Sequence, residues 1–268
     1  MKKVFSPFYK SFECVANKCP INCCALRVPF FEWEVEEFDK RPEWQDIDGN
    51  KHSIKDFIHR ESGKWMCNTR DHNFCTFCTD DRLCGLRLKN GANAEPAVCK
   101  NFPRMVTEFP DRIEYTLDPC CPIANYSLKD WKIGEFIVEG ESSGAEADDS
   151  ARQIVVASFA DPETSLRDCF QLIADTYGVS ATVRIPDLST CKETFLRKMC
   201  AYHFWSYVLA YEGYPGFDNI GGTLLEFFAE YVPTVGECHD DWNELSRHFS
   251  TALISFVRRT GFDLEMED

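Results

Sequence analysis

Residues 12–24, FECVANKCPINCC, place four cysteines within thirteen positions, at Cys14, Cys19, Cys23 and Cys24. The asparagines and the proline between them favour turns, which allow the backbone to direct several sulfurs toward one centre. Soft thiolates are ligands for zinc, cuprous copper and iron–sulfur clusters. The segment therefore predicts a loop-rich fold built around a metal site.

Further cysteines follow at short intervals. Residues 74–86, FCTFCTDDRLCGL, contain Cys75, Cys78 and Cys84, residues 98–106, VCKNFPRMV, contain Cys99, and residues 113–124, IEYTLDPCCPIA, contain Cys120 and Cys121. Eleven of the 15 cysteines lie between positions 14 and 121. Thiols that only fill a core would be scattered, so this grouping favours metal binding. The other four, at 169, 191, 200 and 238, are isolated.

The redox compartment supports the same interpretation. The opening residues MKKVFSPFYKSF contain no uninterrupted apolar run, so no signal peptide is expected. No stretch approaches the length of apolar residues that a membrane span needs. We therefore expect a cytoplasmic protein, in which clustered cysteines indicate metal ligands and not a disulfide framework.

Net charge limits the class of partner. The formal charge of −15 argues against nucleic acid, because binding a phosphate backbone requires clustered lysine and arginine. It would suit a basic protein partner, although acidic solubility gives the same number. With 44% hydrophobic residues, the chain has enough apolar surface to form a core.

Composition changes near residues 131–152, where EGESSGAEADDSA is acidic, small and without pattern. We predict a cysteine-rich domain at 1–130, an acidic linker at 131–152 and a helical domain at 153–268. Helical spacing of apolar residues predicts helices over 166–177, 190–211, 223–232 and 242–259 in the last domain, with no sheet. The first domain should contain a hairpin of 104–109 with 112–117, and short helices at 33–39 and 82–90. The expected fold class is α+β, mainly α.

The four cysteine segments taken together resemble the flagellin lysine-N-methylase family, part of a broader group of zinc- or iron-chelating proteins with eight shared cysteines. The resemblance covers residues 12–128. It implies that the metal ligands are Cys14, Cys19, Cys23, Cys24, Cys75, Cys84, Cys99 and Cys121. Cys78 and Cys120 stand where the family has other residues, and Leu26 replaces a tryptophan.

The resemblance implies a [4Fe–4S] cluster, with zinc as the alternative, and methyl transfer from S-adenosylmethionine to lysine side chains of flagellin or a similar protein. The alternative function is a non-catalytic metal-binding module with a structural, redox-sensing or interaction role, since zinc thiolate sites stabilise small domains directly. Electron transfer is a third possibility. No Gly-rich strand-to-helix loop of the Rossmann type is visible.

Methyl transfer would need a neutral lysine amine, although the ordinary pKa of lysine is about 10.4. Candidate bases are Asp71, Glu114 and Asp118, each of which has the alternative of an ordinary surface carboxylate. Arg104 could hold the methyl donor's carboxylate, or could instead tune the metal site through its hydrogen bonds. Cation–π contact with the sulfonium is assigned to Phe102 and Tyr115, for which packing in the core is the alternative.

Overall fold

The computed structural model describes residues 1–26, 28–40, 44–46, 48–61, 63–70, 74–142, 144–145, 147–208, 210 and 219–260. The chain forms two compact units. Unit 1 contains Met1–Glu13 and Pro103–Leu253, and unit 2 contains Cys14–Phe102 with the chain from Ile254. Unit 2 is therefore mostly an insertion in the sequence of unit 1.

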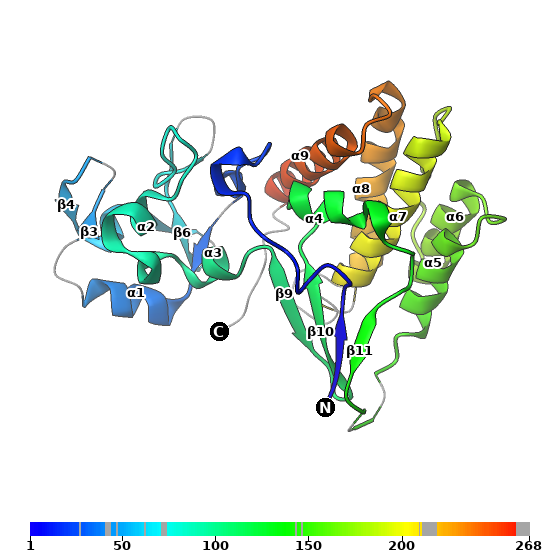
Figure 1. Ribbon diagram of the computed structural model, residues 1–268, viewed down its shortest axis with the longest axis horizontal. Coiled ribbons are helices and arrows are strands. Elements are labelled where there is room, and N and C mark those ends of the chain that lie inside the picture. Colours follow the sequence, from blue (N-terminus) through cyan, green and yellow to red (C-terminus); the bar gives the residue numbers. More distant parts are fainter. Residues whose placement is uncertain are drawn as a thin grey trace. The chain divides into compact units, whose positions relative to one another are not determined.

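Unit 1 contains a four-stranded sheet in the order β11 (Ile137–Glu139), β1 (Lys2–Phe5), β10 (Arg112–Leu117) and β9 (Arg104–Glu108) (Figure 1). β1 runs parallel to β10, and the other pairs are antiparallel. The predicted hairpin of β9 and β10 is confirmed, and the Phe109 amide closes its turn by donating to the Arg112 carbonyl at 2.8 Å.

The remaining elements of unit 1 are mainly helical: α4 (Pro122–Ser127), η6 (Leu128–Asp130), α5 (Ser150–Ala160), α6 (Leu166–Tyr177), α7 (Thr190–Tyr207), α8 (Ile220–Tyr231), η7 (Val232–Glu237) and α9 (Trp242–Thr260), the last of which continues into unit 2. Ser165 and Ser189 cap α6 and α7 by accepting hydrogen bonds from backbone amides of the first turn. Gly178 ends α6 in the left-handed conformation, at φ +64°.

Helix α7 forms the centre of the helical layer, between α5 and α8 (Figure 1). Ten of its side chains are buried, including Phe195, Met199 and Tyr202. The Tyr202 hydroxyl accepts a hydrogen bond of 2.7 Å from the Leu117 amide at the end of β10. The helical layer is therefore tied directly to the sheet, and both belong to one core.

This arrangement differs from the predicted division at 130 and 153. The predicted linker 131–152 supplies β11, and its last residues begin α5. Trp131 is buried, and Asp149 lies at the edge of the core because it pairs with Arg112. The acidic composition of 131–152 suggested a linker, because the residues that pair with it are distant in the sequence. The predicted helices 166–177, 190–211, 223–232 and 242–259 correspond to α6–α9, whereas α5 was not predicted; position 209 and the end of the second range lie outside the described residues.

Unit 2 is built from short elements. Its strands are β2 (Pro29–Phe30), β3 (Trp44–Gln45), β4 (Lys51–His52), β5 (Ile58–Glu61), β6 (Lys64–Cys67), β7 (Thr69–Arg70) and β8 (Phe74–Cys75). Its helices are η1 (Ala16–Lys18), η2 (Cys23–Ala25), α1 (Glu32–Asp39), η3 (Ile54–Asp56), α2 (Gly85–Asn90), η5 (Ala92–Ala94) and α3 (Ala97–Asn101). The core contains Phe30, Phe38, Trp44, Ile54 and Leu86.

The two helices predicted in this unit are present, and each begins at a different residue from the one predicted. α1 begins one residue before the predicted 33–39, whereas α2 begins at Gly85 and not at residue 82. Arg82 has a φ of +61°, and the Leu83 amide donates to the Thr79 hydroxyl, so a turn occupies the predicted first residues of the helix. Gly91, at φ +87°, ends α2.

The fold class is α+β and mainly α, as predicted. None of the helices in the described part of the chain has the length and apolar character needed to cross a membrane.

Candidate metal centre

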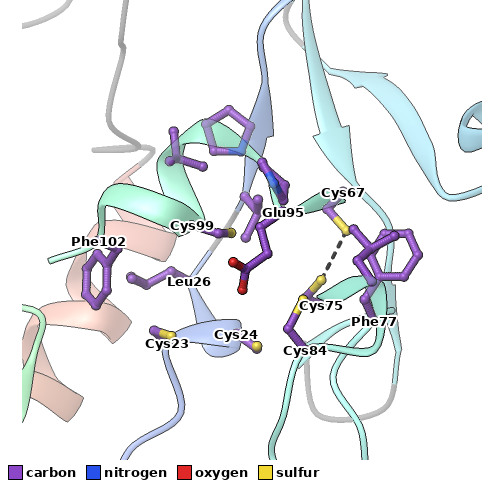
Figure 2. A pocket seen from close by; sticks show the side chains of 15 residues that line it. Cys23, Cys24, Leu26, Cys67, Cys75, Phe77, Cys84, Glu95, Cys99 and Phe102 are labelled. Atoms are coloured by element: carbon purple, nitrogen blue, oxygen red, sulfur yellow. Dashed lines mark hydrogen bonds between the residues drawn. The ribbon is translucent and has the colours of Figure 1, made fainter. Parts of the chain in front are cut away.

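Unit 2 contains a cavity of about 130 Å³ whose wall includes six cysteines (Figure 2). Apolar side chains such as Leu26, Phe77 and Phe102 complete much of the wall, and Glu95 adds a carboxylate. The cysteines come from five separate elements or turns: they are Cys23, Cys24, Cys67, Cys75, Cys84 and Cys99. The fold therefore gathers sulfurs from distant parts of the sequence around one space.

Asn22 positions the first two of these cysteines. Its side-chain oxygen accepts a hydrogen bond of 3.0 Å from the Cys24 amide, which begins the single turn η2. Its side-chain nitrogen donates to the sulfur of Cys78 at 3.0 Å. One asparagine thus holds Cys24 against the loop that carries Cys75 and Cys78.

The sulfurs of Cys67 and Cys75 lie close together. Cys67 ends β6 and Cys75 ends β8, and their sulfurs lie 3.2 Å apart, both buried. A β-pairing between Thr69 and Cys75 brings the two segments together. Both cysteines are free thiols. Cys67 was missed as a site residue, because it stands alone in a strand-like stretch and lies outside the family's cysteine pattern.

Two further cysteines of the cavity are positioned by short helices. Cys84 is the N-cap residue of α2, and the Gly85 amide donates to the Phe77 carbonyl at 2.7 Å, which fixes the loop after Cys78. Cys99 lies in α3, a helix of five residues. Figure 2 shows Cys99 across the cavity from Cys84, with Glu95 between them.

Burial and mutual proximity oppose ionisation of most of these thiols. A hydrogen bond with Cys67, followed by burial, raises the pKa of Cys75 well above its ordinary value. Burial, with smaller effects from Glu95 and Cys75, raises the pKa of Cys84 to about 11. The pKa of Cys99 is raised because the surrounding protein displaces water from its sulfur, although the side chain keeps some accessible surface.

Cys23 is the exception. A hydrogen bond from the Cys24 side chain lowers the pKa of Cys23 to about 7, and the same bond, followed by burial, raises that of Cys24. One thiolate is thus accessible near neutral pH, whereas several neighbouring sulfurs keep their protons. A cation in the cavity would replace those protons, as metals do when they bind thiols.

The residues present fit a thiolate-ligated metal in their chemistry. Six soft sulfur donors surround one cavity in a largely apolar setting, which suits zinc or an iron–sulfur cluster. Within the described ranges, however, no three histidine, cysteine, aspartate or glutamate side chains form a group already arranged to hold a metal ion. The sulfurs therefore line the cavity without converging on a single point.

The structure places the eight predicted ligands in three groups. Five of them line the cavity: Cys23, Cys24, Cys75, Cys84 and Cys99. Cys14 and Cys19 belong to unit 2 but are not in the cavity wall, and Cys14 is exposed. Cys121 is buried in unit 1, with Cys120, and precedes α4.

The residues assigned to the methyl donor have partners in their own units. Arg104 donates to the Phe12 carbonyl at 3.0 Å, and its guanidinium lies 5.5 Å from the Phe12 ring. Tyr115 stacks on Phe5 with ring centres 4.4 Å apart. Both belong to unit 1, whereas Phe102 lines the cavity of unit 2.

The predicted bases are also partnered. Glu114 is buried and accepts hydrogen bonds from Arg112 and Arg152, at 2.7–2.9 Å. Asp118 is buried, which raises its pKa, and accepts bonds of 2.7 Å from the Cys120 amide and the Tyr207 hydroxyl. Asp71 lies outside the described residues. Glu114 and Asp118 are thus interior groups, not surface carboxylates.

Unit 1 contains a second cavity, which is polar and has a volume of about 310 Å³. Glu114, Asp111 and Asp149 line it together with Arg112, and the aromatic rings of Phe136 and Trp205 form another part of the wall. The Arg152 guanidinium lies 3.6 Å from the centre of the Trp205 ring. Three carboxylates, the two guanidiniums and the Lys2 ammonium therefore meet at or beside this cavity, and their formal charges balance.

Comparison of the chain with family models, with curated proteins and with solved structures gives no match.

Proposed function

We propose that this chain is an iron–sulfur protein and that the cavity of unit 2 binds its cluster through cysteine thiolates. The observation that carries this proposal is the gathering of six cysteines from distant segments around one cavity (Figure 2). Zinc is the alternative occupant, since it takes the same thiolate ligands. The cytoplasm, where thiols stay reduced, is the proposed location.

The roles of the residues follow from their positions. Cys23 ionises most readily and would be the first thiolate to bind, and the others would lose their protons as the metal binds. Asn22 keeps Cys24 and Cys78 in place. Leu26, Phe77 and Phe102 would give the bound centre an apolar surround. A bound cluster would supply one-electron chemistry or an electrophilic iron.

The test is metal and sulfide analysis of protein purified without oxygen, together with an absorption spectrum. Iron and acid-labile sulfide in equal amounts, with a broad visible absorption that dithionite bleaches, would support the cluster. Cys23→Ser, Cys84→Ser and Cys99→Ser should each abolish metal loading. Cys191→Ser, in α7 of unit 1, is the matched control and should load normally. Metal content equal to wild type in the first three variants would overturn the proposal.

A second proposed function is methyl transfer from S-adenosylmethionine to lysine side chains of a flagellin-like protein. The observation that favours it is the polar cavity of unit 1, with its three carboxylates and its aromatic wall. Carboxylates and aromatic faces both attract a lysine ammonium. Lys2 also lines this cavity, so the substrate lysine would share the space with a positive charge of the chain itself.

Intact-mass analysis of a lysine-rich flagellin incubated with the cluster-loaded protein and S-adenosylmethionine tests this activity. A gain of whole methyl units, absent when the donor is omitted, would support it. If loaded protein produces no mass gain and calorimetry detects no donor binding, methyl transfer is rejected. The chain would then be a metal-binding module with a structural, redox-sensing or interaction role.

A further inference from the structure

Among the described residues, Glu95 is the one carboxylate that lines the cysteine cavity. We infer that Glu95 is an oxygen ligand of the centre, alongside the cysteine thiolates. This inference rests on the proposed metal-binding function of unit 2. It concerns a residue that the cysteine pattern does not contain.

Position supports a role for Glu95 inside the cavity. The residue lies between η5 and α3, and 13% of its side chain is exposed. Figure 2 shows its carboxylate directed into the space bounded by Cys24, Cys84 and Cys99. The rigid Pro96 follows it and also lines the cavity, so the backbone on that side is constrained.

Charge makes this position costly without a cation. Glu95 shares the cavity wall with the thiols of Cys23, Cys84 and Cys99. A carboxylate and several thiolates cannot all be charged at close range unless a positive charge compensates them. A metal centre supplies that charge, and oxygen ligands from carboxylates bind both zinc and iron.

Two structural roles, as a helix cap and as the partner of Arg87, do not explain the position of Glu95. At the start of α3, the Ala97 amide donates to the Glu34 side chain at 2.6 Å, so Glu95 is not needed as the helix cap. Glu95 pairs with Arg87 at 3.1 Å, but the Arg87 side chain is 60% exposed. Arg87 does not line the cavity, so this pair alone does not account for the placement of a carboxylate among sulfurs.

A carboxylate ligand would make one position of the centre different from the others. Carboxylate oxygen is a harder donor than thiolate and binds zinc at about 2.0–2.2 Å, against about 2.3 Å for sulfur. The metal at this position would therefore be the one at which a ligand exchanges most readily. Its electronic signature would differ from that of an all-cysteine centre.

The test compares wild type, Glu95→Gln, Glu95→Cys and Glu37→Gln, all reconstituted without oxygen using ⁵⁷Fe²⁺ and sulfide. Glu37 is an exposed carboxylate of α1 in the same unit and serves as the control. Mössbauer spectra report the ligands of each iron, and a competing chelator measures affinity. We expect Glu95→Gln to lose at least tenfold in affinity and to lose a distinct oxygen-ligated iron component. Glu95→Cys should restore loading with an all-sulfur spectrum.

The outcomes separate the two proposals. If wild type binds metal, and Glu95→Gln matches it in both affinity and spectrum, the inference about Glu95 is wrong and the metal centre stands. If wild type holds neither iron nor zinc, the proposed function fails, and the inference fails with it. Circular dichroism tests whether Glu95→Gln is folded. If Glu95→Gln is unfolded, the Mössbauer spectrum of Glu95→Cys decides whether position 95 supplies a ligand.

Discussion

Arg152 of α5 lies at the centre of a buried ion network in unit 1. Its side chain is 2% exposed and donates to Glu114 at 2.7 Å and 2.9 Å, to Asp149 at 3.1 Å and to the Trp205 carbonyl at 3.0 Å. Replacing it with methionine keeps most of the side-chain volume but removes four hydrogen bonds, three of them to carboxylates. Glu114, which is 3% exposed, would retain only Arg112 as a cationic partner.

Removing one member of a buried ion pair typically costs about 3–5 kcal/mol, because the remaining charge is left without compensation. A domain is stable by about 5–15 kcal/mol in total, so Arg152→Met should remove a large fraction of the stability of unit 1. Adding Glu114→Gln to Arg152→Met removes the stranded charge. The double variant should therefore lose less than the sum of the two single losses, with a coupling of about 1–3 kcal/mol.

Urea denaturation followed by far-ultraviolet circular dichroism measures these changes, because the long helices α5–α8 belong to unit 1. Lys132→Met is the control: Lys132 pairs with Glu135 at 2.5 Å, with side chains 79% and 58% exposed, so its loss should leave the transition unchanged. A loss below about 1 kcal/mol for Arg152→Met, or strict additivity in the double variant, would refute the view that the network is a coupled unit.

Three other predictions follow from buried groups. His203 is fully buried among aromatic rings, and burial lowers its pKa to about 3. Below about pH 6.5 the unfolded chain therefore binds a proton that the folded chain does not, and the free energy of unfolding should fall by about 2 kcal/mol between pH 7.5 and pH 5. His203→Phe should weaken this pH dependence, as measured by melting curves. Tyr207→Phe removes the hydroxyl that donates to Asp118 at 2.7 Å, and it should lower the free energy of unfolding in urea by about 1–3 kcal/mol. An unchanged midpoint would show that Asp118 does not need this donor. Treatment of loaded protein with a strong chelator should release the metal and lower the melting temperature measured by tryptophan fluorescence. An unchanged temperature would indicate that the metal has no structural role.

Local signals in the sequence predicted much of unit 1. Alternation of apolar residues predicted the β9–β10 hairpin, and apolar residues at helical spacing predicted α6 and α7. Local signals could not predict that β1 pairs with β10, because the partners lie more than a hundred residues apart. They also missed α5, whose buried Arg152 looks like a surface residue until its partners are known.

The candidate site was predicted in part. Five of the cysteines that the resemblance implies as ligands line one cavity, but the cysteine pattern carries no information on the residues between its clusters. Cys67 reaches the cavity through the β7–β8 pairing, and Glu95 through the turn before α3. Cys14 and Cys19 share the spacing pattern without lining the cavity, which shows that spacing alone does not determine membership.

The parallel pairing of β1 with β10 has a consequence for how the chain can evolve and assemble. β1 precedes the inserted residues 14–102 and β10 follows them, so the sheet of unit 1 joins both ends of the insertion. The entropy cost of closing a loop grows only with the logarithm of its length. The fold of unit 1 can therefore tolerate large changes in the length of the inserted residues 14–102. A circularly permuted chain that begins within the insertion would still allow β1 to pair with β10.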